Sequence, residues 1–201
     1  SFSYFVFEQV YDAAGVPIEG LYVDRNGDGT VTPDDMYRYK KAAPDATFGF
    51  YTGVNLGNFD LSLGARAMVG NYVYNNNLAS QGVYDFVYNS SGGTGGGYLN
   101  NVDSQTEALD INTPRYFSDH YVQDGSFLRI DHITAGYDFG NIGSAISSFR
   151  LSITAQNPLL ITGYDGIDPE IASRDVTTNS VGFGIDNNIY PRSRTFLLGL
   201  N

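Results

Sequence analysis

The segment from Asp24 to Asp35 carries oxygen-bearing residues at the spacing of a calcium-binding loop. Five residues fall on ligand positions of the twelve-residue calcium loop: Asp24, Asn26, Asp28, Thr30 and Asp35. Thr30 would offer its backbone carbonyl, and the other four would offer side-chain oxygens. Gly29 stands at the sixth position, where glycine permits the sharp turn that directs these groups inward. The pattern predicts a structural Ca²⁺ site, with Thr32 as a direct or water-bridged further contact.

The same segment also fits a turn followed by a short helix. Asp35 stands where a calcium loop usually has a bidentate Glu, and no long helix is expected before Asp24. In this alternative Thr32 is the helix N-cap, Pro33 is the first helical residue, and Asp35 complements the helix dipole. The sequence leaves both interpretations open.

Other residues that could do chemistry lack suitable partners. The two histidines, His120 and His132, stand in no catalytic-triad or metal-ligand spacing. Asp165 and Asp168 could pair as carboxylates for glycoside hydrolysis, but their string Gly-Tyr-Asp-Gly-Ile-Asp-Pro-Glu is typical of turns. The chain has no cysteine, which excludes disulfides, zinc-thiolate sites and a Cys nucleophile. The sequence therefore predicts that the protein is not an enzyme.

Three arginines fall on or near the polar faces of expected strands: Arg66, Arg129 and Arg150. We expect them to pair with acids such as Asp60 or Asp131. The alternative is a charged wall lining a channel.

The composition limits the classes of partner and of fold. A net charge of −11 repels nucleic acid, whose binding depends on cations that neutralise phosphates. Charged residues make up 16% of the chain against a usual value of about 25%, while Gly, Tyr, Phe, Asn and Asp are abundant. This composition favours strands and turns over helices. We expect no helix beyond the short one after Thr32.

The elements that would position these residues are strands with one apolar and one polar face. Apolar and polar residues alternate in five segments: 48–56, 59–70, 127–139, 149–156 and 195–201. Residues 1–7 are also strand-like. In 127–139 the alternation changes phase near Asp131 and His132, which predicts a β-bulge. We therefore expect an all-β fold of antiparallel strands.

Short and long connections alternate along the chain. Gly57-Asn58 predicts a tight turn and residues 140–148 a short connection, whereas three long loops are expected at about 9–45, 76–126 and 163–193. The middle loop contains a glycine-rich run at 90–97 that lacks the signature of a phosphate-binding loop. Short turns on one side, long loops on the other and strands of about 9–13 residues are typical of transmembrane β-barrels.

The many tyrosines suggest two roles. A membrane-interface girdle would use residues near the expected strand ends: Tyr72, Tyr74, Tyr121 and Tyr137. Platforms for sugar rings in the outer loops would use a second set: Tyr84, Phe86, Tyr88 and Tyr98.

Six strings together resemble the C-terminal end of the SusC/RagA family of TonB-linked outer-membrane proteins from Bacteroidetes-type bacteria. They are PIEGLYVDRNGDG at 17–29, APDATFGF at 43–50, GNYVY at 70–74, YVQDGSFLRI at 121–130, AQNPLLI at 155–161 and GIDNNIYPR at 184–192. They occur in the family's order across nearly the whole chain.

The resemblance implies that residues 1–201 are a C-terminal fragment of a β-barrel of about 22 strands in the cell outer membrane. It implies import of glycans or peptides, a SusD-like surface lipoprotein as partner, contact with outer-membrane lipid, and energy from TonB through an N-terminal part that we expect to be missing here. A different class stays open on the sequence: a soluble, calcium-dependent carbohydrate-binding β-sandwich with one core between two sheets.

Overall fold

The computed structural model describes residues 3–89, 98–143, 146–171, 183–187 and 189–201. Contacts divide the chain into two compact units. The sheet unit comprises Pro44–Gly70, Gly125–Gly163 and Tyr190–Asn201, and the loop unit comprises Ser1–Ala43, Asn71–Asp124 and Tyr164–Ile189. Among the described residues, no helix has the length and apolar character needed to cross a membrane.

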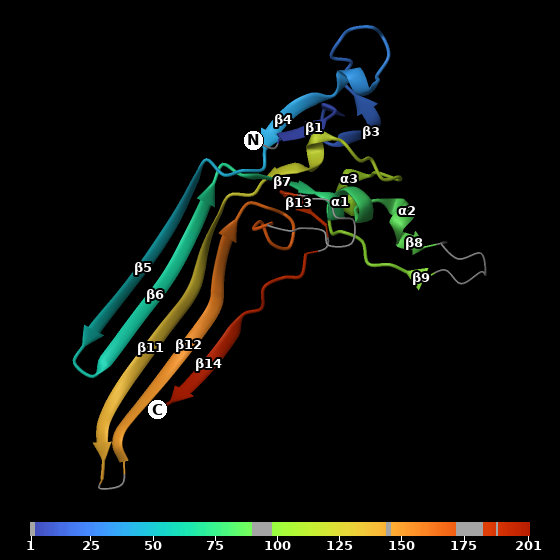
Figure 1. Ribbon diagram of the computed structural model, residues 1–201. Helices are drawn as coiled ribbons and strands as arrows, with labels where there is room; N and C mark the ends of the chain where they lie inside the picture. Colours follow the sequence, from blue (N-terminus) through green and yellow to red (C-terminus); the bar gives the residue numbers. More distant parts are fainter. Residues whose placement is uncertain (1–2, 90–97, 144–145, 172–182, 188) are drawn as a thin grey trace. The chain divides into compact units, whose positions relative to one another are not determined.

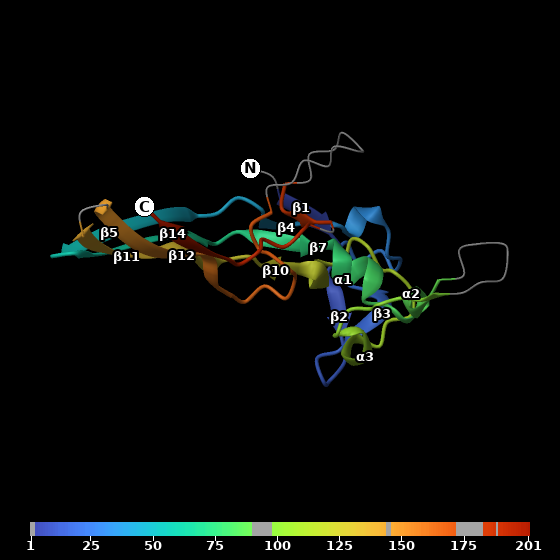
Figure 2. The ribbon, with the colours of Figure 1, turned by 90° about the horizontal axis from the view of Figure 1, so that it is seen from below.

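The sheet unit is one antiparallel sheet of five strands in the order β14-β12-β11-β6-β5 (Figure 1). The strands are β5 (Ala46–Leu56), β6 (Phe59–Val69), β11 (Phe127–Ile142), β12 (Ile146–Thr162) and β14 (Thr195–Leu200). Figure 2 shows the same sheet from below. The predicted all-β, antiparallel fold is confirmed, and each of the five alternating segments forms a strand.

Each face of this sheet gathers one kind of residue because successive side chains of a strand point to opposite sides. In the register of β5 with β6, Phe48, Phe50 and Val54 pair with Ala67, Ala65 and Leu61. On the other face, Gly49, Gly53 and Asn55 pair with Arg66, Ser62 and Asp60. The apolar face is open, since Phe48 and Phe50 are each 59% exposed. The β-sandwich alternative is therefore wrong for this sheet, because a second sheet would bury those rings.

The turns and the bulge of the sheet follow the sequence. Gly57 and Asn58 alone join β5 to β6, and Gly57 takes a positive φ of 61° that glycine adopts without strain. The connection between β11 and β12 is shorter than the expected 140–148, because the two strands already pair at Ile142 and Ile146. The register shifts between Ile130 and His132 against both neighbouring strands, which confirms the predicted bulge.

The loop unit consists of short elements. Its strands are β1 (Ser3–Val6), β2 (Gln9–Tyr11), β3 (Pro17–Tyr22), β4 (Tyr37–Lys41), β7 (Tyr72–Asn75), β8 (Tyr88–Asn89), β9 (Tyr98–Leu99), β10 (Val122–Asp124) and β13 (Ile185–Asp186). β1 pairs with β4, β2 with β3 and β8 with β9, and β7 lies between β10 and β13. Its 3₁₀ helices are η1 (Pro33–Asp35) and η2 (Asp119–Tyr121), and its α-helices are α1 (Asn76–Gln81), α2 (Tyr84–Val87) and α3 (Thr106–Leu109).

The expectation of no helix beyond the one after Thr32 is wrong, because three short α-helices and η2 lie within the connection 76–126. Helices this short gain their stability from tertiary packing rather than from local pattern. In α1, the side chain of Asn75 accepts the N–H of Leu78 at 2.9 Å, while Leu78 and Ala79 are buried. Their partners come from the distant residues Leu109, Ile111 and Tyr121, which a local pattern does not reveal.

The aromatic girdle prediction is wrong for Tyr74 and Tyr121. Tyr121 is 1% exposed in the core beside α1, and Tyr74 packs against that core with its ring centroid 6.3 Å from that of Tyr121. Tyr72 also belongs to the loop unit, where the Lys40 ammonium lies 4.8 Å from its ring centroid. Tyr137 lies on the sheet, exposed and 4.7 Å from the ring of Phe139, which is the kind of position the girdle requires.

Candidate functional site

The predicted calcium loop is folded around its own side-chain oxygens. The Asp24 carboxylate accepts the N–H groups of Gly27 at 2.7 Å and Gly29 at 2.8 Å. The Asn26 side chain accepts the N–H of Asp28 at 2.9 Å, and Asp28 in turn accepts the N–H and hydroxyl of Thr30, both at 2.9 Å. These bonds turn the oxygens of Asp24, Asn26 and Asp28 toward the loop's own backbone.

Asp35 closes this loop. Its fully buried carboxylate accepts the N–H groups of Thr32 at 2.8 Å, Arg25 at 2.9 Å and Asn26 at 3.1 Å. These bonds favour the charged form, and the one from Thr32 contributes most to lowering the pKa of Asp35. The three bonds fill much of the acceptor capacity that a bidentate metal ligand would need.

The helix-cap interpretation of the segment is confirmed. Thr32 caps η1 by accepting the N–H of Asp34 at 3.3 Å, Pro33 is the first helical residue, and Thr32 and Asp35 form a reciprocal capping box. Among the described residues, no group of three or more acidic or histidine side chains is placed to hold a metal ion. Calcium binding by Asp24, Asn26, Asp28, Thr30 and Asp35 stays a prediction.

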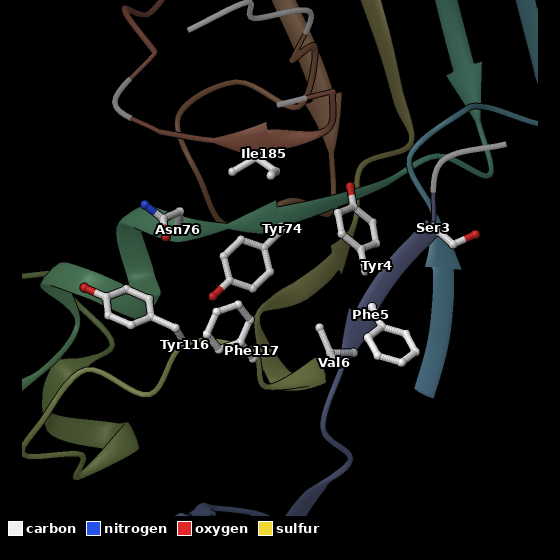
Figure 3. A pocket seen from close by; sticks show the side chains of 9 residues that line it. All are labelled: Ser3, Tyr4, Phe5, Val6, Tyr74, Asn76, Tyr116, Phe117 and Ile185. Carbon is white, nitrogen blue, oxygen red and sulfur yellow. The ribbon is translucent and has the colours of Figure 1, made fainter. Parts of the chain in front are cut away.

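An aromatic pocket of about 410 Å³ lies in the loop unit (Figure 3). Its lining comes from β1, from the junction of β7 and α1, from residues 116–117 and from β13: Ser3, Tyr4, Phe5, Val6, Tyr74, Asn76, Tyr116, Phe117 and Ile185. None of these side chains is charged at neutral pH, so the pocket suits an uncharged group with an apolar face. Sequence reasoning missed this pocket because its walls lie far apart in the chain.

Two tight backbone contacts shape this pocket. Phe117 has a positive φ of 70°, which is strained for a bulky residue. Its carbonyl accepts the N–H of Phe7 at 2.7 Å, which fixes it beside β1. From β1, the Tyr4 hydroxyl donates to the carbonyls of Tyr72 at 2.7 Å and Gly184 at 2.8 Å. A Cβ on Gly184 would lie 2.3 Å from that hydroxyl, so glycine is required there.

A second hollow of about 310 Å³ in the loop unit is polar. Amide and carboxylate side chains dominate its lining: Asn75, Asn77, Gln81, Asn101, Asp103 and Asp165. The turn interpretation of the string around Asp165 is confirmed, because Asp168 accepts the N–H of Glu170 at 2.9 Å and is itself buried.

Two carboxylates of the loop unit, one partly and one fully buried, are stabilised in opposite ways. Glu19 accepts five hydrogen bonds from Asn112, Thr113 and Arg115, at 2.7–3.1 Å. Partial burial would raise the pKa of Glu19, but the bonds from Asn112 and Thr113 outweigh it and lower the pKa to about 2. Asp186 is fully buried between Tyr164, at 2.7 Å, and Asn77, at 3.1 Å, and burial raises its pKa.

The predicted arginine pairs lie on the polar face of the sheet. Arg150 makes a bidentate pair with Asp60 at 2.8 and 2.9 Å, and Arg66 lies 3.1 Å from Asp131. Arg129 is buried, with the guanidinium 5.6 Å from the ring centroid of Phe127. Pairing with Asp60 and Asp131 is thus confirmed for two of the three arginines.

The other candidate residues from the sequence, His120 and the proposed sugar platforms, lie apart from one another. The His120 ring lies 3.1 Å from the Tyr11 hydroxyl, and burial lowers the pKa of His120. Of the proposed sugar platforms, Phe86 packs against the α1 core and Tyr84 is exposed. The side chains of Tyr88 and Tyr98, and the glycine-rich run 90–97, lie outside the described residues.

Comparison with known proteins places the chain among bacterial receptors. No family model matches it. The TonB-dependent receptor SusC of Bacteroides thetaiotaomicron is 41% identical over 209 residues, covering 99% of this chain and 19% of that protein. The TonB-dependent receptor P3 of Formosa agariphila is 30% identical over 193 residues, covering 90% of this chain and 18% of that protein. The chain thus spans about a fifth of the length of these relatives.

Solved structures share the fold. The RagAB peptide transporter matches with a TM-score of 0.68 at 21% identity, covering 98% of this chain and 22% of that chain. The RagAB peptide importer in its closed-closed state matches with a TM-score of 0.65 at 22% identity, with the same coverage.

Proposed function

This chain belongs to the SusC/RagA type of TonB-dependent receptors, which are outer-membrane proteins, and we propose that it forms part of an importer in that membrane. Its sheet would be a section of the wall of a large barrel, near the C-terminal end of the whole protein. Its loop unit would belong to the long loops that such barrels carry on one side.

The two-faced sheet is the observation that carries this proposal. An apolar face whose Phe and Leu side chains are open to their surroundings suits contact with outer-membrane lipid. The opposite face, with its arginine–aspartate pairs and threonines, suits a water-filled interior. In lipid, every backbone N–H and C=O must be paired, so both edge strands would continue into further strands of the barrel.

The transported substrate would be a glycan or a peptide, taken up with a SusD-like surface lipoprotein and with energy from TonB. Support comes from the identity to SusC and from the likeness to the RagAB peptide transporter. Neither relative's name assigns the substrate of this chain. No chemical step is needed from its residues, which agrees with the lack of a catalytic motif in the sequence.

The test uses the full-length receptor that contains this chain, tagged in its native host. We expect it in the outer-membrane fraction, together with a lipoprotein that co-purifies. Labelled oligosaccharides and labelled peptides are then offered to cells with and without the receptor, and with and without TonB. Loss of uptake of one class in both mutants supports the proposal. Unchanged uptake of both classes, or receptor in the soluble fraction, would overturn it.

We also propose that the loop of residues 24–35 binds Ca²⁺ weakly, in the class of about 10⁻⁴–10⁻³ M that is filled outside cells. In support, the side-chain oxygens of Asp24, Asn26 and Asp28 already face into the loop, where they accept its own N–H groups. A cation would relieve the repulsion between these acids. The role would be structural, ordering a surface loop for the lipoprotein or the substrate.

Calorimetry at millimolar calcium tests this second proposal. We expect a heat of binding that Asp28→Ala abolishes while the strands stay intact. If no heat appears, and a chelator leaves the loop's resistance to protease unchanged, the segment acts only as a helix cap.

A further inference from the structure

Two seams of the sheet, β6–β11 and β12–β14, have no short turn to set their register. A two-residue turn joins β5 to β6, and only residues 143–145 separate β11 from β12, so a short connection brings the strands of each hairpin together. The β11–β12 ladder also shifts register at three places along its length. The seam between β6 and β11 is different, because residues 70–126 separate the two strands in sequence. Something other than a turn must align the two hairpins along this seam.

A side chain crosses this seam above Gly136. Gly136 of β11 pairs with Asp60 on β6 and with Ser152 on β12. From β12, Arg150 reaches over β11 to the carboxylate of Asp60, with nitrogen–oxygen distances of 2.8–3.2 Å. A Cβ on Gly136 would lie 2.4 Å from the Arg150 guanidinium and 2.5 Å from the Asp60 carboxylate. A Cβ at this position would therefore force the guanidinium or the carboxylate to move from its present place.

A second side chain crosses a glycine farther along the same seam. Gly64 of β6 pairs with Tyr51 on β5 and with His132 on β11. The His132 ring lies over Gly64, where a Cβ would come within 2.5 Å of it, and its centroid is 6.0 Å from that of Tyr51. The first contact thus joins β12 to β6 across Gly136, and the second joins β11 to β5 across Gly64.

We propose that these two glycine-crossing contacts set the register of the β6–β11 seam. A slip by one residue would exchange the polar and apolar faces and is excluded on that ground. A slip by two residues keeps the faces and is the real competitor. With both hairpins intact, it would move Asp60 from Gly136 to Thr134 or Asp138, away from the Arg150 guanidinium, which stays over Gly136. It would also place Ser62 or Arg66 beneath His132, and the Cβ of either residue closes the path of the His132 ring.

Cysteine cross-linking measures the register in the full-length receptor. Leu61 and Ala135 are partners in the native register, so Leu61→Cys with Ala135→Cys reports that register. Leu63→Cys with Ala135→Cys reports a slip by two residues. This chain contributes no cysteine of its own. In each background the ratio of native to slipped cross-link is compared.

Gly136→Ala is the decisive variant, because it changes neither charge of the ion pair. We expect the ratio of native to slipped cross-link to fall about two- to fivefold, the range for a contact on a partly exposed face. Gly49→Ala is the matched control: it lies on the polar face of β5 with nothing within 4 Å of its Cβ, and it should leave the ratio unchanged.

Charge reversal provides a second test if Gly136→Ala prevents assembly. Asp60→Arg and Arg150→Asp should each lower the ratio, and the double variant should recover much of it. The proposal is overturned if Gly136→Ala keeps the ratio of Gly49→Ala, if it lowers the receptor level with no slipped product, or if the double variant behaves like the single ones.

Discussion

The two units of this chain differ in what they do with their apolar side chains. In the loop unit, Leu78 and Val73 are each 1% exposed, within clusters that the chain supplies entirely itself. In the sheet unit, large apolar side chains stay open, for example Leu56 at 69% and Phe196 at 74% exposed. The loop unit therefore has a protein core, whereas the apolar face of the sheet is exposed and is the face proposed to contact lipid. In an outer-membrane receptor, the loop unit would thus be stabilised by burial of its own side chains, and the sheet by burial of its apolar face in lipid.

Polar groups follow the same division. In the loop unit, buried polar side chains such as Ser118 and Asp186 make direct hydrogen bonds at 2.7–3.2 Å. On the sheet, the Arg150–Asp60 and Arg66–Asp131 pairs are about one-third exposed. Loss of a polar partner should therefore cost more stability in the loop unit than on the sheet.

The largest expected effect comes from emptying the core of the loop unit. Leu78→Ala should lower the free energy of unfolding by about 2–5 kcal/mol, because it removes a buried side chain and leaves a cavity. Leu61→Ala, at a position 41% exposed on the sheet, should cost much less in detergent micelles. Hydrogen exchange of the receptor, measured separately for the loop unit and the sheet unit, reports the loss of protection that each variant causes. Equal protection losses would show that the two units do not differ in this way.

A charge on the apolar face of the sheet should cost far more than truncation of a side chain there. Leu61→Arg places a cation on the face assigned to lipid, and such substitutions cost about 2–4 kcal/mol near the middle of a bilayer. The adjacent Ser62→Arg points to the polar face and should be nearly neutral. Urea unfolding in lipid vesicles measures both variants. A similar loss from both would mean that the faces are assigned wrongly.

The same division explains how much the sequence revealed. The sheet was predictable because its signals are local: alternation such as that in 59–69, the turn at Gly57, and the phase change before His132. The core of the loop unit was not predictable, since Leu78 meets Ile111 and Tyr121 through contacts that no local pattern records. Tyr121 was predicted as a girdle residue because it stands near the end of an expected strand. Its burial is a tertiary effect.

The loop unit, but not the sheet, should lose stability at moderately low pH through Glu19. The pKa of Glu19 is about 2 in the folded chain and about 4.5 when unfolded. The carboxylate thus stabilises the fold above pH 4.5, and that stabilisation, roughly 1–3 kcal/mol, is lost as the pH falls toward 2.

Limited proteolysis near Asn112 measures this loss between pH 5 and pH 2, an interval of about three units chosen to span both pKa values. Glu19→Gln should weaken the segment already at neutral pH and flatten the pH response, while Glu107→Gln, at an exposed position, should change neither. A response that survives in Glu19→Gln would assign the acid sensitivity to another group.

The smallest effect is expected at the η1 cap, which tests whether a short element of the loop unit is held by local bonds alone. Thr32→Ala removes the side-chain acceptor of the capping box and should cost about 1 kcal/mol, because the N–H of Asp34 loses its partner. Thr32→Ser keeps the acceptor and should cost little.

Asp35 still accepts the N–H groups of Arg25 and Asn26 in both variants, so the loop should loosen at η1 without opening. Hydrogen exchange over residues 24–36, with and without millimolar calcium, separates the two contributions. Loosening in Thr32→Ala that calcium reverses would mean that the ion and the cap stabilise the same turn, whereas loosening that calcium leaves untouched would mean that the cap alone holds it.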